Sequence, residues 1–159
     1  MRITDQYLWN FVFSVLFLAL VFMATVVLDT EAYKSYESLT LLDYTLMILA
    51  TFRLTRLFVY DKITAFFREQ FSDIGEGKNG MVLVKPARGP RRTIADLLSC
   101  PWCFGMWAAG TVAFFYLLTP YAFFVILMLA IGALGTLMQL LANLIGWKAE
   151  QLKMDVESR

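Results

Sequence analysis

The longest uncharged segment of the chain is the feature that most constrains its fold. Residues 7–28 contain no Asp, Glu, Lys or Arg over 22 positions. A helix that crosses the hydrocarbon core of a bilayer needs roughly 20 apolar residues. The apolar run is too long for the core of a signal peptide, and no convincing Ala-x-Ala cleavage site follows it. The sequence therefore predicts an uncleaved membrane-spanning helix.

Further apolar segments predict a multi-span membrane protein. Hydrophobic residues make up 59% of the chain and its mean hydropathy is +0.62, which is too apolar for a soluble domain of 159 residues. Three more spans are predicted: residues 41–60, 101–118 and 121–145. The first of these contains Asp43, Arg53 and Arg56, and the last two are separated only by Thr119 and Pro120, as in a tight helical hairpin. We expect four spans in a single membrane domain.

The positions of the basic residues predict the orientation. Lys34 is the only one of the 14 Lys and Arg residues that would lie outside the cell if the N-terminus is inside. The others fall in the N-terminal residues, near the end of the second span, in the loop of residues 61–99, and in the tail of residues 146–159. Short basic loops resist translocation, so we expect both termini on the cytoplasmic side.

The predicted cytoplasmic loop, residues 61–99, has room for structure of its own. It divides into an interfacial helix, a flexible turn, and a β-prone run that becomes basic: residues 61–73, 75–80 and 81–92. A further short helix is expected to begin at Thr93, with Asp96 at the fourth position of a T-x-x-D capping pattern.

Charged residues near the end of the second span form one helical stripe. On a continuous helix, Arg56, Asp61, Thr64 and Arg68 all lie within about 80° of Arg53. One interpretation is a cytoplasm-facing network, in which Asp61 bridges arginines that bind an anionic headgroup or a partner's carboxylate. The other is that both arginines extend to the lipid phosphates and fix the depth of the helix. The second is the simpler, because neither arginine lies in the outer half of the span.

A basic cluster in the loop is a second candidate binding site. Four basic residues fall within eight positions: Lys85, Arg88, Arg91 and Arg92. Each could contribute on the order of 1 kcal/mol near an anionic membrane surface. We therefore expect anionic lipid or an acidic protein partner at this face.

Small and amide residues predict where the last two spans pack. The last span places four such residues on one face: Gly132, Thr136, Gln139 and Asn143. The third span has a ridge of small residues at four-residue spacing: Gly105, Ala109 and Ala113. We expect these two faces to pack on each other. A homo-oligomer interface and the polar conduit of a small transporter subunit are the alternatives.

Both cysteines of the chain lie in the segment SCPWCFG. A closed zinc site needs four ligands, and with no histidine only two chains together could supply them. A thiol–disulfide site is chemically reasonable, because Cys100 and Cys103 meet the start of a predicted helix, which lowers thiol pKa values. The motif would, however, lie on the reducing side of the membrane. The structural interpretation is that Pro101 begins the third span, Trp102 anchors it, and the cysteines pack at the bend.

Two motifs together resemble a known family. RLTRLFVYDKIT, residues 53–64, and CPWCFGMW, residues 100–107, are similar to motifs of the small bacterial membrane proteins grouped as domain of unknown function thirteen-sixty. The resemblance extends from about residue 41 to residue 145. It implies several spans in the bacterial cytoplasmic, or inner, membrane and implies no activity. The signature positions are Arg53, Arg56, Asp61, Thr64, Arg68, Cys100, Pro101, Trp102, Cys103, Gly105 and Trp107.

The sequence thus predicts an all-α bundle of four membrane helices, with a short interfacial helix between the second and third spans. The expected function is a non-enzymatic interaction or scaffold module in the membrane. A thiol–disulfide or metal-linked protein that uses Cys100 and Cys103 is the alternative, and a small transporter subunit is a weaker one. We expect no cofactor, no resident metal and no nucleic-acid partner.

Overall fold

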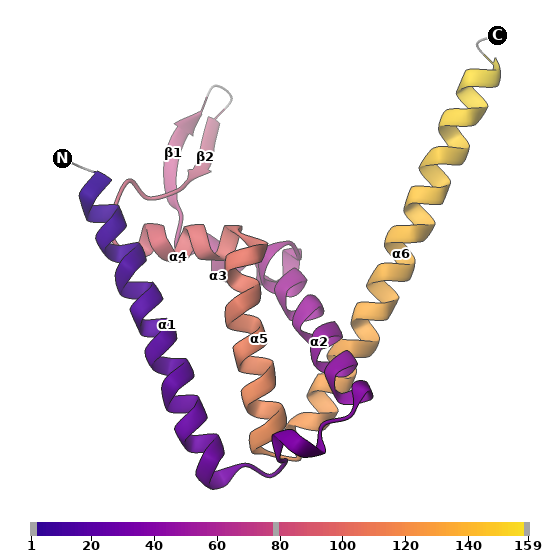
Figure 1. Ribbon diagram of the computed structural model, residues 1–159. Helices are drawn as coiled ribbons and strands as arrows, with labels where there is room; N and C mark the ends of the chain where they lie inside the picture. The colour runs from indigo at the N-terminus through magenta and orange to yellow at the C-terminus, as the bar shows by residue number, and fades with distance from the viewer. Residues whose placement is uncertain (1–2, 78–79, 158–159) are drawn as a thin grey trace.

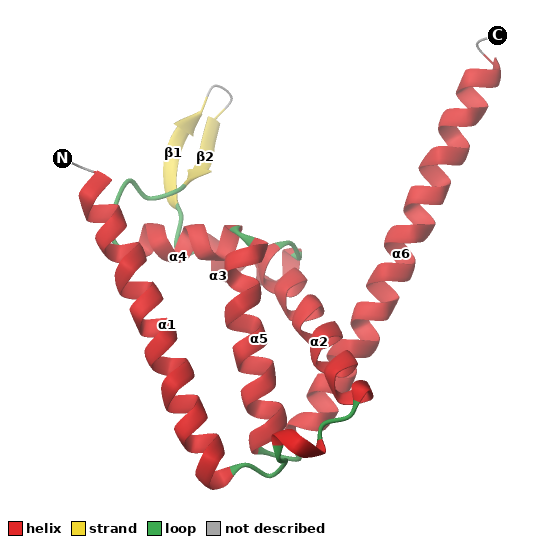
Figure 2. Ribbon diagram, in the orientation of Figure 1, coloured by secondary structure: helices red, strands yellow, loops and turns green. Residues whose placement is uncertain are grey.

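The computed structural model describes residues 3–77 and 80–157 and is predominantly helical (Figure 1 and Figure 2). Four long helices form the body of the molecule: α1 (Ile3–Glu31), α2 (Leu41–Val59), α5 (Pro101–Leu118) and α6 (Ala122–Glu157). The predicted start of the third span at a proline is confirmed, because Pro101 is the first residue of α5. The hairpin turn at Thr119 and Pro120 is also confirmed.

Three of these helices are long and apolar enough to cross a membrane within the described ranges. They are residues 6–31 of α1, and the whole of α5 and α6. The prediction of four such helices is correct only in part. Every 18-residue window of α2 contains Asp43, Arg53 and Arg56, so its composition alone does not mark α2 as a span.

The charged helix α2 is the packing centre of the molecule. It packs more extensively on α5 and on α6 than these two helices pack on each other, and the ribbon shows it beside both (Figure 1). Ala50 of α2 is fully buried in a cluster with Val112, Tyr116 and Ile126. Helix α1 lies on the other side of α5, where the rings of Phe17 and Trp107 are 5.0 Å apart.

The connections divide the bundle into two ends. The loops of residues 32–40 and 119–121 lie together at what we call the loop end, where the Lys34 amide donates to the Leu117 carbonyl at 3.1 Å. The start of α1, the end of α2 and residues 60–100 lie at the opposite, terminal end (Figure 1). The last turns of α6 extend away from the other helices in the same general direction.

Residues 61–99 form short elements across the terminal end. They are a 3-10 turn (Lys62–Thr64), α3 (Ala65–Glu69), the strands β1 (Asp73–Gly77) and β2 (Gly80–Val84), and α4 (Pro90–Ser99). The strands pair antiparallel, with Asp73 opposite Val84. The predicted all-α fold class is confirmed, and this small hairpin is an addition to it. The predicted flexible turn of residues 75–80 lies in this hairpin, and its residues 78–79 are outside the described part.

Helix α4 begins earlier than the T-x-x-D pattern predicts. Gly89 precedes it with a φ of +88°, a conformation that favours glycine, and Pro90 is its first residue. Thr93 therefore lies within the helix and does not cap it. The pattern instead describes the start of α2, where the Thr40 hydroxyl and the Asp43 carboxylate form a complete capping box.

Candidate functional site

A groove lies between α1, α4 and α5 at the terminal end. Its volume is about 670 Å³. Aromatic side chains of α1 and α5, including Phe13, Phe17 and Trp107, form one part of its lining. Polar groups and both cysteine thiols form the other part: Asn10, Ser14, Lys85, Thr93, Asp96, Ser99, Cys100 and Cys103. The groove thus combines an apolar wall with chemically reactive groups.

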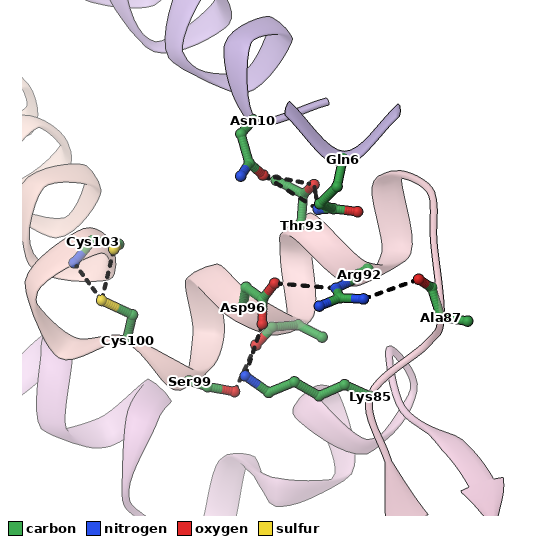
Figure 3. A network of polar contacts seen from close by, with 11 residues as sticks. Gln6, Asn10, Lys85, Ala87, Arg92, Thr93, Asp96, Ser99, Cys100 and Cys103 are labelled. Carbon is green, nitrogen blue, oxygen red and sulfur yellow. Dashed lines mark hydrogen bonds and ion pairs between the residues drawn. The ribbon is translucent and has the colours of Figure 1, made fainter. Parts of the chain in front are cut away.

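The two thiols lie against each other at the start of α5. Cys100 is the residue before the helix, and its sulfur accepts a hydrogen bond from the Cys103 amide at 3.3 Å. The Cys103 thiol donates to the same sulfur at 2.6 Å (Figure 3). Both cysteines are free; Cys103 is exposed and Cys100 is half-buried. The motif therefore caps the helix and also presents a dithiol.

These contacts favour the thiolate of Cys100. The hydrogen bond from the Cys103 thiol, supported by backbone N–H groups and by the positive charge of Lys85, lowers the pKa of the Cys100 thiol from its usual value. Thiolates are the nucleophilic form of cysteine, and a position at a helix start commonly activates them.

An ion-pair cluster holds the polar side of the groove. Lys85 Nζ lies 2.8 Å from Asp96 Oδ1, and Arg92 Nε lies 3.7 Å from Asp96 Oδ2 (Figure 3). Helix α4 is also fastened to α1, because Gln6 Nε2 donates to the Thr93 hydroxyl at 2.8 Å and that hydroxyl donates to Asn10 at 3.2 Å. These contacts connect residues more than 80 positions apart and define one wall of the groove.

Two residues of the arginine stripe, Thr64 and Arg68, cap the C-terminal end of α2. Arg68 Nη1 donates to the Phe58 carbonyl at 2.7 Å and to the Asp61 carbonyl at 3.1 Å, while the Thr64 hydroxyl donates to the Leu57 carbonyl. The last carbonyl groups of a helix have no partner within the helix, so these two side chains cap α2. The sequence identified both residues but assigned them to ligand binding.

The remaining charged residues of the stripe have two different environments. Arg53 pairs with Asp61 at 3.0 Å, and each side chain is 26% exposed. The Arg56 guanidinium lies over the Tyr60 ring, 5.5 Å from its centre, and its Nε is buried without a hydrogen-bond partner in the described structure. Asp61 therefore pairs with one arginine, and Arg56 retains an unused donor.

The basic cluster of the loop is less available than its sequence indicates. Lys85 and Arg92 pair with Asp96, as described above. Arg91 pairs with Asp73 at 3.3 Å and donates to the Gln70 carbonyl at 2.9 Å. Arg88 is exposed and makes no ion pair within the described residues.

Two of the predicted packing residues face α2. A Cβ atom on Gly105 of α5 would lie 3.8 Å from the Thr55 hydroxyl, and one on Gly132 of α6 would lie 3.6 Å from Arg53 Nε. Both glycines therefore face the central helix α2. Ala109 and Ala113 are half-buried, and the Thr136 hydroxyl donates within α6 to the Gly132 carbonyl.

The amide side chains of α6 do not line a described cavity. Gln139 and Asn143 are exposed and bond to each other at 3.1 Å. No contact in the described residues supports the polar conduit expected of a transporter subunit.

The two sequence motifs lie at the same end of the bundle without forming one pocket. The Phe58 ring of α2 and the Phe104 ring of α5 are 5.3 Å apart. The groove, however, is lined by Cys100 and Cys103 and by neither Arg53, Arg56 nor Asp61. Among the described residues, no group of three or more His, Cys, Asp or Glu side chains is placed to hold a metal ion.

A buried charge at the loop end was missed by the sequence reasoning. Asp43 is only 5% exposed, yet it forms an ion pair with Lys34 at 2.8 Å and accepts a hydrogen bond from Tyr116. Its second oxygen accepts from the Thr40 amide at 2.7 Å and from the Thr40 hydroxyl at 2.8 Å. The signal was present in the sequence, because Thr40 and Asp43 form a T-x-x-D pattern directly before an apolar run.

Comparisons with known proteins agree with the resemblance noted from the motifs. Residues 46–142 match the model of the family described as "Protein of unknown function (DUF1360)". The sporulation protein YjcA of Bacillus subtilis is 37% identical over 108 residues, which cover 64% of this chain and 92% of that protein. UPF0713 protein YngL of the same organism is 37% identical over 86 residues, or 53% of this chain and 65% of that protein. No solved structure matches. The chain belongs to the DUF1360 family of proteins of unknown function.

Proposed function

We propose that this chain is a four-span membrane protein in which α2 is the fourth crossing helix. Its 19 residues give a length of about 28 Å, close to the roughly 30 Å of a bilayer core. Helix α2 runs between two helices that are apolar enough to span, α5 and α6. Its carboxylate is satisfied by Lys34, Tyr116 and Thr40. These contacts would offset much of the cost of placing a charge at the membrane.

The same proposal orients the protein in a bacterial cytoplasmic membrane. Lys34 is the only basic residue in the loops of the loop end, whereas the terminal end carries the basic residues of the loop of residues 61–99. The orientation with fewer positive charges outside puts the terminal end in the cytoplasm. The two Bacillus subtilis relatives described above come from a bacterium, which fits this location.

In this setting, the terminal end would act as an interaction module that binds anionic lipid headgroups, a role that itself involves no chemical reaction. The observation that carries this proposal is the presence of exposed basic and exposed aromatic side chains at the same end. Lys62 and Arg88 are exposed, Phe66 is 67% exposed and Trp102 is 86% exposed. Aromatic rings favour the headgroup level, and cations there attract anionic lipid.

The test measures lipid-dependent stability of the full chain in detergent micelles. Thermal unfolding is followed after addition of phosphatidylglycerol or phosphatidylcholine, at low and at high salt. We expect phosphatidylglycerol to raise the Tm more, and the excess to shrink at high salt because exposed charges are screened.

Two variants locate the effect. Lys62→Ser with Arg88→Ser should remove much of the phosphatidylglycerol excess. Lys153→Ser, whose lysine is exposed near the end of α6 and lies 3.9 Å from Glu157, should retain it. If the extra rise in Tm with phosphatidylglycerol does not depend on salt, or is equal in both variants, headgroup binding at this site is refuted.

A further inference from the structure

The groove between α1, α4 and α5 brings together the dithiol and a volume suitable for a small ligand. We propose that Cys100 and Cys103 form a thiol–disulfide exchange site whose substrate is a small amphipathic disulfide bound in this groove. This activity goes beyond the proposed lipid-binding role and depends on different residues.

Cys100 is placed to be the attacking thiolate. Its sulfur lies at the start of an 18-residue helix, where the partial positive charge of the helix dipole favours an anion. It accepts hydrogen bonds from the amide and the thiol of Cys103, at 3.3 Å and 2.6 Å. The positive charge of Lys85 adds to this stabilisation.

Cys103 is placed to resolve the first product. The Cys100 thiolate attacks one substrate sulfur, so a protein–substrate disulfide forms and one substrate thiolate leaves. The Cys103 thiol, already in contact with Cys100 Sγ, then loses its proton and attacks that sulfur. The second substrate thiolate leaves. The substrate disulfide has gained two electrons and has left as two thiolates, one of which can take the proton that Cys103 gave up. The protein dithiol has become a Cys100–Cys103 disulfide.

The lining of the groove indicates the class of substrate. Its volume of about 670 Å³ falls within the range of ligand pockets, roughly 300–1,000 Å³. Phe17 and Trp107 offer an aromatic wall, and Asn10, Thr93 and the Lys85–Asp96 pair offer polar groups. A small disulfide with both apolar and polar parts matches this lining better than a folded protein does.

The first experiment uses the reduced full chain in micelles and the aromatic disulfide dithiobis(nitrobenzoate). We expect both nitrothiobenzoate groups to be released, and mass spectrometry to find an internal disulfide without an adduct. A chain that keeps an adduct on each cysteine would overturn the proposal. This experiment needs no variant and therefore does not depend on the folding of one.

Single substitutions then separate the roles of the two thiols. Cys103→Ser should react rapidly and retain a mixed disulfide on Cys100. Cys100→Ser should react several-fold more slowly at pH 7, because the remaining thiol lies inside the helix and lacks the N–H donors that stabilise the Cys100 thiolate. The advantage of Cys100 should diminish as the pH rises and both thiols ionise. Equal rates at pH 7 in the two variants would contradict an activated Cys100.

A third comparison tests the groove itself. Ser14 of α1 lines the groove, whereas the adjacent Val15 is exposed and lies outside its lining. Ser14→Phe should slow the reaction with the aromatic disulfide several-fold relative to Val15→Phe. Alkylation of Cys100 by the smaller iodoacetamide should be affected less. If Ser14→Phe and Val15→Phe react equally with the aromatic disulfide, the groove is not the substrate site.

Discussion

The two ends of α2 hold charged residues in opposite ways. At the loop end, both oxygens of the buried Asp43 carboxylate have partners from the chain itself: Lys34 and Tyr116 for one, Thr40 for the other. At the terminal end, Arg53 and Asp61 form a pair that is about a quarter exposed. Arg56 keeps a buried Nε with no partner in the described structure.

This difference indicates that the charged residues at the loop end stabilise the fold, whereas the terminal end has groups that are available to bind a ligand. Lys34, Asp43 and Tyr116 come from a loop and two helices, so their cluster fastens the loop end and leaves no oxygen for a ligand. The terminal end has the unpartnered Nε of Arg56, the exposed cations Lys62 and Arg88, and the free thiols of Cys100 and Cys103. Interaction and chemistry are therefore expected at the terminal end.

The strongest test of this comparison removes the cation at the loop end. Lys34→Met leaves the Asp43 carboxylate buried beside Tyr116 without a counter-charge, and the loss of one partner of a buried pair is strongly destabilising. We expect the Tm in micelles to fall by about 5 °C or more. Lys148→Met, a matched change of an exposed residue on α6, should leave the Tm nearly unchanged. Equal shifts in the two variants would mean that the cluster does not hold the loop end.

A pH titration examines the same cluster. The hydrogen bond to Asp43 raises the pKa of Lys34 above its usual 10.5. A raised pKa means that folding stabilises the protonated lysine, so this contribution is complete below pH 10.5 and is lost as the pH rises through the higher folded value. The Tm advantage of the native chain over Lys34→Met should therefore be constant from pH 7 to about pH 9. A difference that already disappears between pH 7 and pH 9 would contradict the ion pair.

A smaller effect is expected from the cap of α2 at the terminal end. Arg68→Met removes the donors to the Phe58 and Asp61 carbonyl groups. Because these groups can be partly hydrated, we expect a loss of about 1–3 kcal/mol in the free energy of unfolding, measured in a denaturant titration. Lys62→Met removes a nearby exposed cation and should change it by less than about 0.5 kcal/mol. If Arg68→Met matches Lys62→Met, Arg68 is not a structural cap.

Much of the helical architecture follows from local sequence signals. The uncharged run of residues 7–28 and the Pro101 start of α5 both predict helices that the structure contains. Such features depend on neighbouring residues, so a single sequence is enough to detect them. The central position of α2 is not local. It depends on Ala50 fitting against Val112 and Ile126 in other helices, which no periodicity within α2 reveals.

The candidate site was predictable as a set of residues but not as an arrangement. The sequence placed Thr64 and Arg68 on one face of a continuous helix, yet α2 ends at Val59 and both side chains turn back to its last carbonyl groups. The groove was not foreseen, because its walls join Asn10, Thr93 and Cys100, which are far apart in the chain. Only the approach of α1 to α4 brings them together.

The smallest expected effect concerns the space beside Arg53 on α6. A Cβ on Gly132 would lie 3.6 Å from Arg53 Nε, an ordinary contact distance, whereas one on Gly135 would meet nothing within 4 Å. Both substitutions, Gly132→Ala and Gly135→Ala, should raise the stability of α6 by up to about 1 kcal/mol, since alanine favours the helix. The difference in the free energy of unfolding between the two variants isolates the Arg53 contact. We expect this difference to be below about 0.5 kcal/mol in a denaturant titration. A loss above about 1 kcal/mol for Gly132→Ala relative to Gly135→Ala would show that Arg53 is held as rigidly as Asp43. The distinction between the two ends of α2 would then disappear.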